Sequence, residues 1–137
     1  MRSHLAPAYP FEGCGVLIGT ASATSRVDIF EAIGTRNSEL TRGEDRYSIH
    51  PSDYAAIERD LLAGKDGARI VGFFHSHPDA PAWPSAVDLE MAQGLFDVTR
   101  EFYVYAIVSV SGGVAHNAAF WRLVPDASRF VELRATT

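Results

Sequence analysis

Cysteine is nearly absent from this chain, which carries a single thiol, Cys14, among its 137 residues. One cysteine cannot form an intramolecular disulfide, so we expect a protein of the reducing cytoplasm that folds without covalent cross-links. The chain has no cluster of lysine and arginine, and its formal net charge of −5 argues against nucleic-acid binding. No apolar run is long enough to span a membrane, and no charged start followed by an apolar segment indicates a signal peptide.

Hydrophobic residues, by contrast, make up 47% of the sequence and charged residues 21%, which is typical of a globular protein. The length suits one core, and we expect residues 1–137 to form a single domain. Pro7 and Pro10 lie in the segment before Glu12, so no helix is expected to run through it, and we expect this tail to be irregular. Apolar spacing predicts one helix over residues 51–63 and a second that begins after Ser85.

Short apolar or alternating runs separate these helices and predict strands. The expected strands cover residues 14–19, 26–33, 46–49, 69–76, 102–110, 114–124 and 130–133. The glycine pair 112–113 is typical of a hairpin turn between two of them. Because strands and helices do not alternate strictly, we expect an α+β fold, an α/β sandwich with a mixed β-sheet flanked by helices.

The segment HSHPDAPAWPSAVD, residues 75–88, holds two histidines, a serine and an aspartate. On a strand, His75 and His77 point to the same face, and Asp88 lies at the start of the following helix. Two imidazoles and one carboxylate suit zinc and leave a fourth tetrahedral position open. A chance pair of histidines on a polar strand edge is the alternative that these residues leave open.

Hydrolysis at such a centre also needs a carboxylate that moves a proton and a donor for the oxyanion. Four acidic residues are candidates for the base, and spacing does not choose among them: Glu12, Glu31, Asp79 and Glu90. Glu12 directly precedes an apolar strand, where a surface turn is the alternative explanation. Ser85 can donate to the oxyanion, cap the helix, or do both.

The strings EGCGVLIG, residues 12–19, and HSHPDAPAWPSAVD resemble the JAMM (MPN+, Mov34/PAD-1-like) zinc metallopeptidase family. The family motif is an upstream glutamate, then His-x-His, seven residues, serine, two residues and aspartate, and this sequence matches it without a gap. The resemblance covers most of the chain, including Tyr47 and the helix after Pro51, and it is greatest to the small stand-alone prokaryotic members. It implies the cytidine-deaminase-like MPN fold.

By position, the resemblance implies that His75, His77 and Asp88 bind Zn²⁺, that Glu12 is the general acid/base, and that Ser85 helps to hold the oxyanion. It implies hydrolysis of an amide or isopeptide bond after the C-terminal Gly-Gly of a ubiquitin-like or sulfur-carrier protein. Two alternatives remain: a non-catalytic MPN-type protein-binding scaffold, which characteristically lacks the ligands, and a metal-dependent amidase that acts on a small molecule.

A Gly-Gly tail is thin and extended, and such a peptide is well held by strand addition to a sheet edge. We therefore predict that residues 78–84 and the segment after Ile33 form the walls of a narrow slot above the metal. Trp83, between the ligands and Ser85 in sequence, is expected to contact the incoming peptide.

Overall fold

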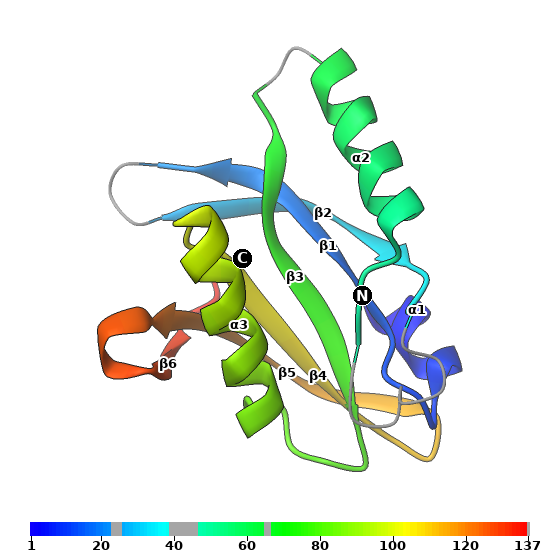
Figure 1. Cartoon of the computed structure of the whole chain (residues 1–137). Helices are drawn as coiled ribbons and strands as arrows, with labels where there is room; N and C mark the ends of the chain where they lie inside the picture. Colours follow the sequence, from blue (N-terminus) through cyan, green and yellow to red (C-terminus); the bar gives the residue numbers. More distant parts are fainter. Residues whose placement is uncertain (23–25, 39–46, 65–66, 137) are drawn as a thin grey trace.

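The computed structural model describes residues 1–22, 26–38, 47–64 and 67–136. Its centre is a single sheet of six strands, which Figure 1 shows with its helices. The strands are β1 (Cys14–Ala21), β2 (Val27–Thr35), β3 (Arg69–Pro78), β4 (Val104–Ser111), β5 (Val114–Val124) and β6 (Arg129–Leu133). The helices are α1 (Arg2–Leu5), α2 (Pro51–Ala63) and α3 (Ala86–Thr99), with short 3-10 turns η1 (Ala6–Ala8) and η2 (Pro125–Ala127).

The strand order is β2-β1-β3-β4-β5-β6, and the sheet is mixed. Strands β3 and β4 pair in parallel, joined by α3 as the crossover, whereas the other neighbours pair antiparallel. The expected α+β fold around a mixed sheet is therefore confirmed. Two parallel strands need a long crossover connection between them. Here the segment from the end of β3 to the start of β4, which contains α3, provides it.

Two hydrophobic clusters lie on the two faces of the sheet. Helices α2 and α3 cover one face on either side of β3, and their apolar residues pack with Phe73 and Tyr105 of the sheet (Figure 1). On the other face, Leu5 of α1 is fully buried against Leu17 and Phe74. Because β3 is covered on both faces, nearly all of its residues are buried, as its apolar sequence predicted.

The structure corrects the expected N-terminal segment. Residues 2–5 form the helix α1, and Pro7 lies within η1, so the segment is ordered rather than irregular. Pro7 is tolerated because it occupies the first turn of η1, where its missing N–H has no helical partner. Burial of Leu5 stabilises this ordered segment, because folding removes its side chain completely from water.

Strand boundaries differ from the expected ones by a few residues at three places. Strand β3 continues to Pro78, so both histidines lie within the strand and are held by its ladder with β4. The strand expected over residues 46–49 is reduced to one bridge between Asn37 and Ile49, and Arg46 lies outside the described residues. The loop expected after residue 33 begins later, because β2 runs to Thr35.

Both long helices begin at side-chain caps. The Nδ1 atom of His50 accepts a hydrogen bond from the backbone N–H of Ser52, and Pro51 occupies the first helical position of α2. At α3, Ser85 and Asp88 form a reciprocal capping box. Within the described part of the chain, no helix is long and apolar enough to cross a membrane.

Arg36, just after β2, is tied to Asp53 in the first turn of α2. The guanidinium Nη2 lies 2.9 Å from Asp53 Oδ1, and the Arg36 backbone N–H donates to Oδ2 at 2.8 Å. These hydrogen bonds from Arg36 lower the pKa of Asp53 to about 2. A carboxyl group whose pKa falls on folding stabilises the fold above its unfolded pKa and loses that contribution as pH falls towards its folded pKa.

We therefore expect Asp53→Asn to lower the melting temperature at pH 7, and the gap from wild type to close as pH falls from about 4 to about 2. Thermal unfolding across that pH range measures the gap. Asp60→Asn, which removes an exposed carboxylate of the same helix, is the matched control and should leave the melting temperature nearly unchanged. A gap that stays constant from pH 7 to pH 2 would contradict the ion pair as its cause.

Candidate metal centre

His75 and His77 lie near the end of β3 and project from the same face of the sheet. Their Nε2 atoms are 3.1 Å apart, and both side chains are buried. Ser76 between them points to the opposite face, as the strand alternation predicted. The pairing of β3 with β1 and β4 holds both histidine backbones, so the imidazoles converge on a point set by the sheet.

Asp88 approaches these histidines from the first turn of α3. Its Oδ1 lies 3.2 Å from His75 Nε2 and its Oδ2 lies 2.8 Å from His77 Nε2. The capping box fixes this carboxylate, because Oδ2 accepts from the N–H of Ser85 at 2.9 Å and the Asp88 N–H donates to Ser85 Oγ at 3.1 Å. Burial by itself would raise the pKa of Asp88, but hydrogen bonds from the two histidines outweigh it and hold the pKa well below its usual range.

Glu12 completes the cluster from the segment before β1. It is 3% exposed, and its Oε1 lies 4.0 Å from His75 Nε2. The backbone around it is hydrogen-bonded on both sides, since Asn37 Nδ2 donates to the Glu12 carbonyl at 2.9 Å. Ser76 forms two hydrogen bonds with Gly13, the residue after Glu12. Its Oγ accepts from the Gly13 N–H at 2.8 Å, and its own N–H donates to the Gly13 carbonyl at 3.0 Å.

The other three carboxylates considered for the base lie elsewhere. Glu31, Asp79 and Glu90 are exposed, and none belongs to the group of ligand atoms around the histidines. Asp79 accepts a hydrogen bond from Tyr9 at 2.7 Å instead. Cys14 is fully buried beside the site, and burial raises the pKa of its thiol to about 11, which disfavours a thiolate.

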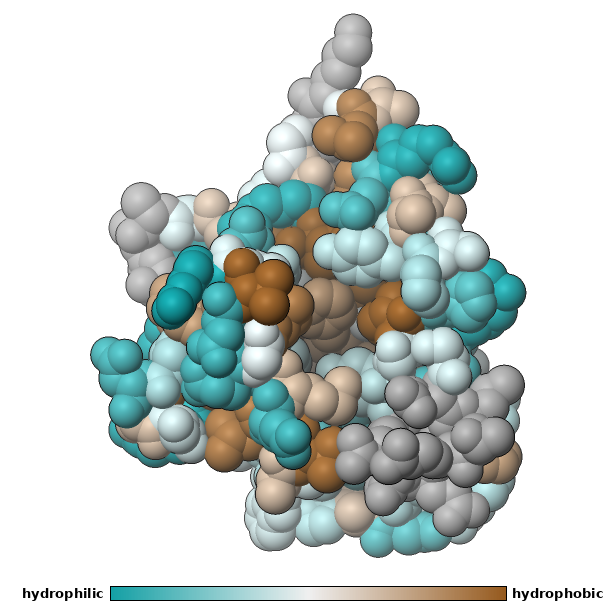
Figure 2. All heavy atoms as spheres, in the orientation of Figure 1, coloured by the Kyte–Doolittle hydropathy of each residue, from teal (hydrophilic) through white to brown (hydrophobic). Residues whose placement is uncertain are grey.

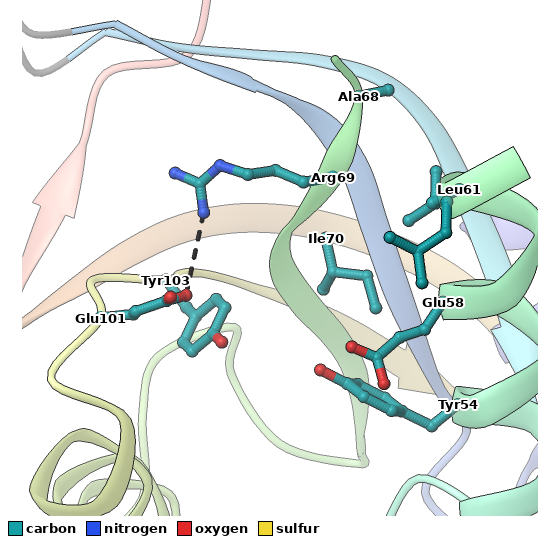
Figure 3. Close-up of a pocket in the computed structure, with 9 residues that line it drawn as sticks. Tyr54, Glu58, Leu61, Ala68, Arg69, Ile70, Glu101 and Tyr103 are labelled. Carbon is teal, nitrogen blue, oxygen red and sulfur yellow. Dashed lines mark ion pairs between the residues drawn. The ribbon is translucent and has the colours of Figure 1, made fainter. Parts of the chain in front are cut away.

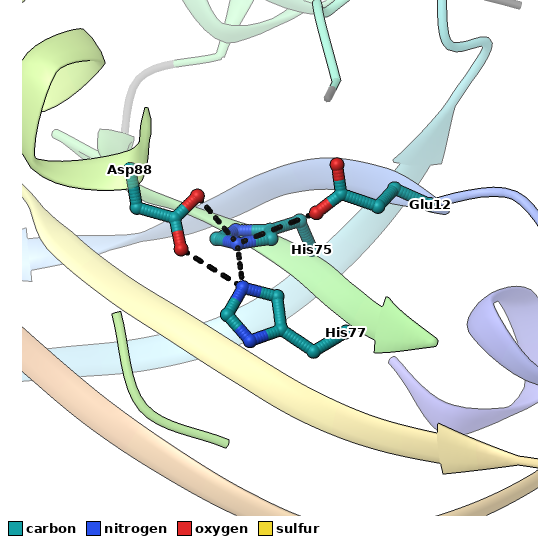
Figure 4. Close-up of side chains that lie close together, drawn as sticks. All are labelled: Glu12, His75, His77 and Asp88. Atoms are coloured by element: carbon teal, nitrogen blue, oxygen red, sulfur yellow. Dashed lines mark hydrogen bonds and ion pairs between the residues drawn. The ribbon is translucent and has the colours of Figure 1, made fainter. Parts of the chain in front are cut away.

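Glu12, His75, His77 and Asp88 offer ligand atoms that all lie within 4.8 Å of one another (Figure 4). All four side chains are buried, and two of them are carboxylates. Two buried carboxylates repel each other unless a positive charge lies between them, so the donor set suits a divalent cation. The cluster matches a metal site in residue type, burial and convergence.

His77 is oriented through its second ring nitrogen. Its Nδ1 lies 2.9 Å from the carbonyl oxygen of Pro81, which can only accept, so Nδ1 carries the proton and Nε2 faces the cluster.

Burial lowers the pKa of His75. Burial would lower that of His77 as well, but the hydrogen bond to Asp88 outweighs it, so the pKa of His77 is raised.

The loop between β3 and α3 is anchored by side chains. The carbonyl oxygen of Ala80 accepts from Ser109 Oγ at 2.6 Å, and that of Ala82 accepts from Trp121 Nε1 at 3.1 Å. Pro81, the acceptor for His77, lies between these two anchored residues. Its carbonyl is therefore held in place before any ligand binds. Trp83 follows and is 63% exposed.

The sequence did not predict the contacts that three residues make around the cluster. The ring of Tyr47 stacks on His75, with centroids 4.4 Å apart and 18° between the planes. Asn37 braces Glu12, and Ser76, which the strand pattern turned away from the site, braces Gly13. No local pattern marks such contacts, because each joins segments distant in sequence.

A cleft of about 330 Å³ lies between α2 and the first residues of β3, at the end of β3 opposite the histidines (Figure 3). Tyr54 and Glu58 of α2 line one side, and Arg69 and Glu101, whose side chains pair at 3.8 Å, lie on the opposite side (Figure 3). Figure 2 shows the same face hollowed near its centre, where apolar residues lie among hydrophilic ones. The cleft shares this face of the sheet with the cluster, although no cluster residue lines it.

Comparison with known proteins agrees with this geometry. Residues 1–124 match the family model described as prokaryotic homologs of the JAB domain. The chain is 35% identical over 102 residues to the Lys-63-specific deubiquitinase BRCC36 of Xenopus laevis, covering 72% of this chain and 38% of that protein. It is 32% identical over 103 residues to the desampylase of Haloferax volcanii, covering 75% of this chain and 66% of the relative.

The chain thus spans little more than a third of the first relative and just under two thirds of the second. A solution structure of a protein from Salinibacter ruber matches with a TM-score of 0.67 and 36% identity, over 96% of this chain and 80% of that one. The family model matches nearly the whole chain, and the fold gathers four of the five motif residues into one buried cluster. This protein therefore belongs to the JAB/MPN family, among the prokaryotic homologs of the JAB domain.

Proposed function

We propose that this protein is a zinc-dependent peptidase or isopeptidase. Its reaction would be hydrolysis of the amide or isopeptide bond after the C-terminal Gly-Gly of a ubiquitin-like or sulfur-carrier protein. The observation that carries the proposal is the buried convergence of Glu12, His75, His77 and Asp88 within 4.8 Å. A scaffold that only binds partners has no need of four buried side chains whose ligand atoms converge on one point.

In this proposal His75, His77 and Asp88 hold the zinc ion through two nitrogens and one carboxylate. When bound, Zn²⁺ polarises the scissile carbonyl and lowers the pKa of a water molecule to about 7. The tautomer of His77 supports this role, because its protonated Nδ1 faces the Pro81 carbonyl and leaves Nε2 for the cluster.

Glu12 is proposed as the general acid/base. Its carboxylate is buried and faces the histidines, and its backbone is braced by Asn37 and by Ser76 through Gly13. In this role it accepts a proton from the attacking water and passes it to the leaving nitrogen, so that the amine departs neutral. A buried side chain on a backbone held in this way loses little further freedom when the substrate arrives.

Ser85 is proposed to donate to the oxyanion that develops on the scissile carbonyl. Its Oγ accepts from the Asp88 N–H, which leaves its own hydroxyl proton available, and the residue is exposed to an incoming substrate. Helix cap and oxyanion donor are thus compatible, because one role uses a lone pair and the other uses the proton.

Ser85→Ala is expected to lower kcat by about 10²-fold or more, as loss of one oxyanion donor does elsewhere. Ser85→Gly removes the same hydroxyl but costs the helix only a few tenths of a kcal/mol as a cap, compared with ~1 kcal/mol for alanine. Steady-state kinetics and denaturant unfolding on both variants separate the two roles. Unchanged kcat in Ser85→Gly would rule out the oxyanion role.

The substrate class is inferred from relatives and from the shape expected of the slot. The two relatives carry the names deubiquitinase and desampylase, which supports a ubiquitin-like substrate here. The anchored loop over residues 79–84 gives one rigid wall, and its exposed Trp83 is suited to contact a thin peptide. The opposite wall is expected from the segment after Ile33, and part of that segment, residues 39–46, lies outside the described residues.

The proposal is tested with zinc-loaded protein and a ubiquitin-like protein joined through its Gly-Gly tail to a reporter, by a peptide bond in one substrate and a lysine isopeptide bond in another. Cleavage after the second glycine, abolished by a chelator and by a Gly→Val change in the tail, is the expected result. Turnover of small amides alone would favour the amidase. A protein that binds no zinc and cleaves nothing, yet captures a ubiquitin-like protein, would favour the scaffold.

A further inference from the structure

The two histidines of the cluster are oriented in different ways. His77 has a hydrogen-bond acceptor for its outer nitrogen, the carbonyl of Pro81 at 2.9 Å. His75 is 1% exposed, and its Nδ1 is buried without a hydrogen-bond partner among the described residues. A ligand imidazole normally donates its second N–H to a fixed acceptor, which sets both the tautomer and the ring orientation. His75 therefore needs another means of holding its ring.

Tyr47 covers the face of this imidazole. The two rings are nearly parallel, at 18°, with centroids 4.4 Å apart, and Tyr47 is itself 8% exposed. A ring stacked at this distance blocks rotation of the imidazole about its bond to the β carbon, because the rotating edge would enter the phenol ring. The contact is made by the aromatic face, not by the hydroxyl.

The backbone that follows Tyr47 is anchored to the segment that braces Glu12. Ser48 N–H donates to Asn37 Oδ1 at 2.9 Å, while Asn37 Nδ2 donates to the Glu12 carbonyl. The next residue, Ile49, forms a β-bridge with Asn37. Tyr47 is thus held against His75 by contacts that do not pass through the histidine.

We propose that Tyr47 is the positioning residue for His75: its stacked ring holds the imidazole with Nε2 towards the cluster, as Pro81 does for His77 by hydrogen bonding. The inference rests on the proposed zinc centre. The inference predicts that zinc affinity depends on an aromatic ring at position 47 and does not depend on the hydroxyl group of Tyr47.

The test is zinc affinity, measured by competition with a chromophoric chelator, without any substrate. Tyr47→Phe keeps the ring and should bind zinc within about 3-fold of wild type, whereas Tyr47→Leu should bind about 10- to 100-fold more weakly, as for loss of other outer contacts of a metal ligand. Tyr103→Leu is the matched control, because that tyrosine packs edge-on against Phe73 and not against a cluster histidine, and it should bind like wild type.

Equal affinity of Tyr47→Leu and wild type would overturn the inference, as would a Tyr47→Phe variant as weak as Tyr47→Leu. If wild type itself binds no zinc, the proposed function fails rather than the role of Tyr47. Should Tyr47→Leu not fold, NMR of the zinc-loaded wild type decides. Strong contacts between the ring protons of Tyr47 and His75, with a single orientation of the imidazole, are expected, and their absence would overturn the inference equally.

Discussion

A Glu12→Gln variant is expected to bind zinc like wild type and to lose about 10²- to 10⁴-fold in kcat, the range typical of general acid–base catalysis. Glutamine has the shape of glutamate and the buried site accepts it, but it cannot carry the proton from water to the leaving nitrogen. The loss should fall on kcat with little change in KM, because the amide removes an interaction made in the transition state. Single-turnover cleavage of the Gly-Gly-linked reporter measures it.

Glu31→Gln and Glu90→Gln are the matched controls, since both are exposed glutamates outside the cluster and should keep wild-type turnover. Metal analysis of each variant must show the same zinc content, so that a loss of turnover is not a loss of the ion. Full activity of Glu12→Gln would mean that the base has been assigned to the wrong residue.

Removing a proposed ligand is expected to remove the ion itself. Wild type should contain about one zinc per chain, and His77→Ala should contain essentially none, because two remaining protein ligands cannot complete the site. Asp88→Asn is the more specific test of a ligand, because it changes the charge of the side chain and keeps its shape. Asparagine keeps an oxygen that can accept from Ser85 N–H and so preserves the cap, but it removes the negative charge that balances the cation.

Elemental analysis of the purified variants, with unfolding curves recorded alongside, checks this prediction. His116→Ala is the control, because His116 is exposed and lies outside the cluster. Stoichiometric zinc in both His77→Ala and Asp88→Asn would contradict the ligand set. Absence of zinc from wild type, even after it is added back, would leave the scaffold as the better account.

Much of the site could be predicted from the sequence because its signals are local. Alternation along a strand puts His75 and His77 on one face, and the spacing from Ser85 to Asp88 is that of a helix cap. These patterns depend on residues two or three apart, whose relative geometry secondary structure dictates. The α+β fold followed for the same reason, because the apolar runs and helical stripes each report one local element.

Spacing along the chain could not choose among the four carboxylates, whereas the family resemblance implied Glu12, and Glu12 is the one of the four that the fold brings to the histidines. That choice depends on the pairing of β1 with β3, which places Cys14 opposite His75 and so carries the preceding residues to the cluster. Register between strands some sixty residues apart comes from packing of the whole sheet, and no local pattern encodes it.

The order of the N-terminal segment was likewise decided by tertiary structure. Two prolines made the segment look irregular, but burial of Leu5 against the sheet stabilises a short helix that would not form alone. The sequence by itself thus determined the family, the ligand residue types and their local faces. Only the tertiary structure decided how Glu12 reaches the histidines and that Tyr47 stacks on His75, because contacts between distant segments are set by packing across the sheet.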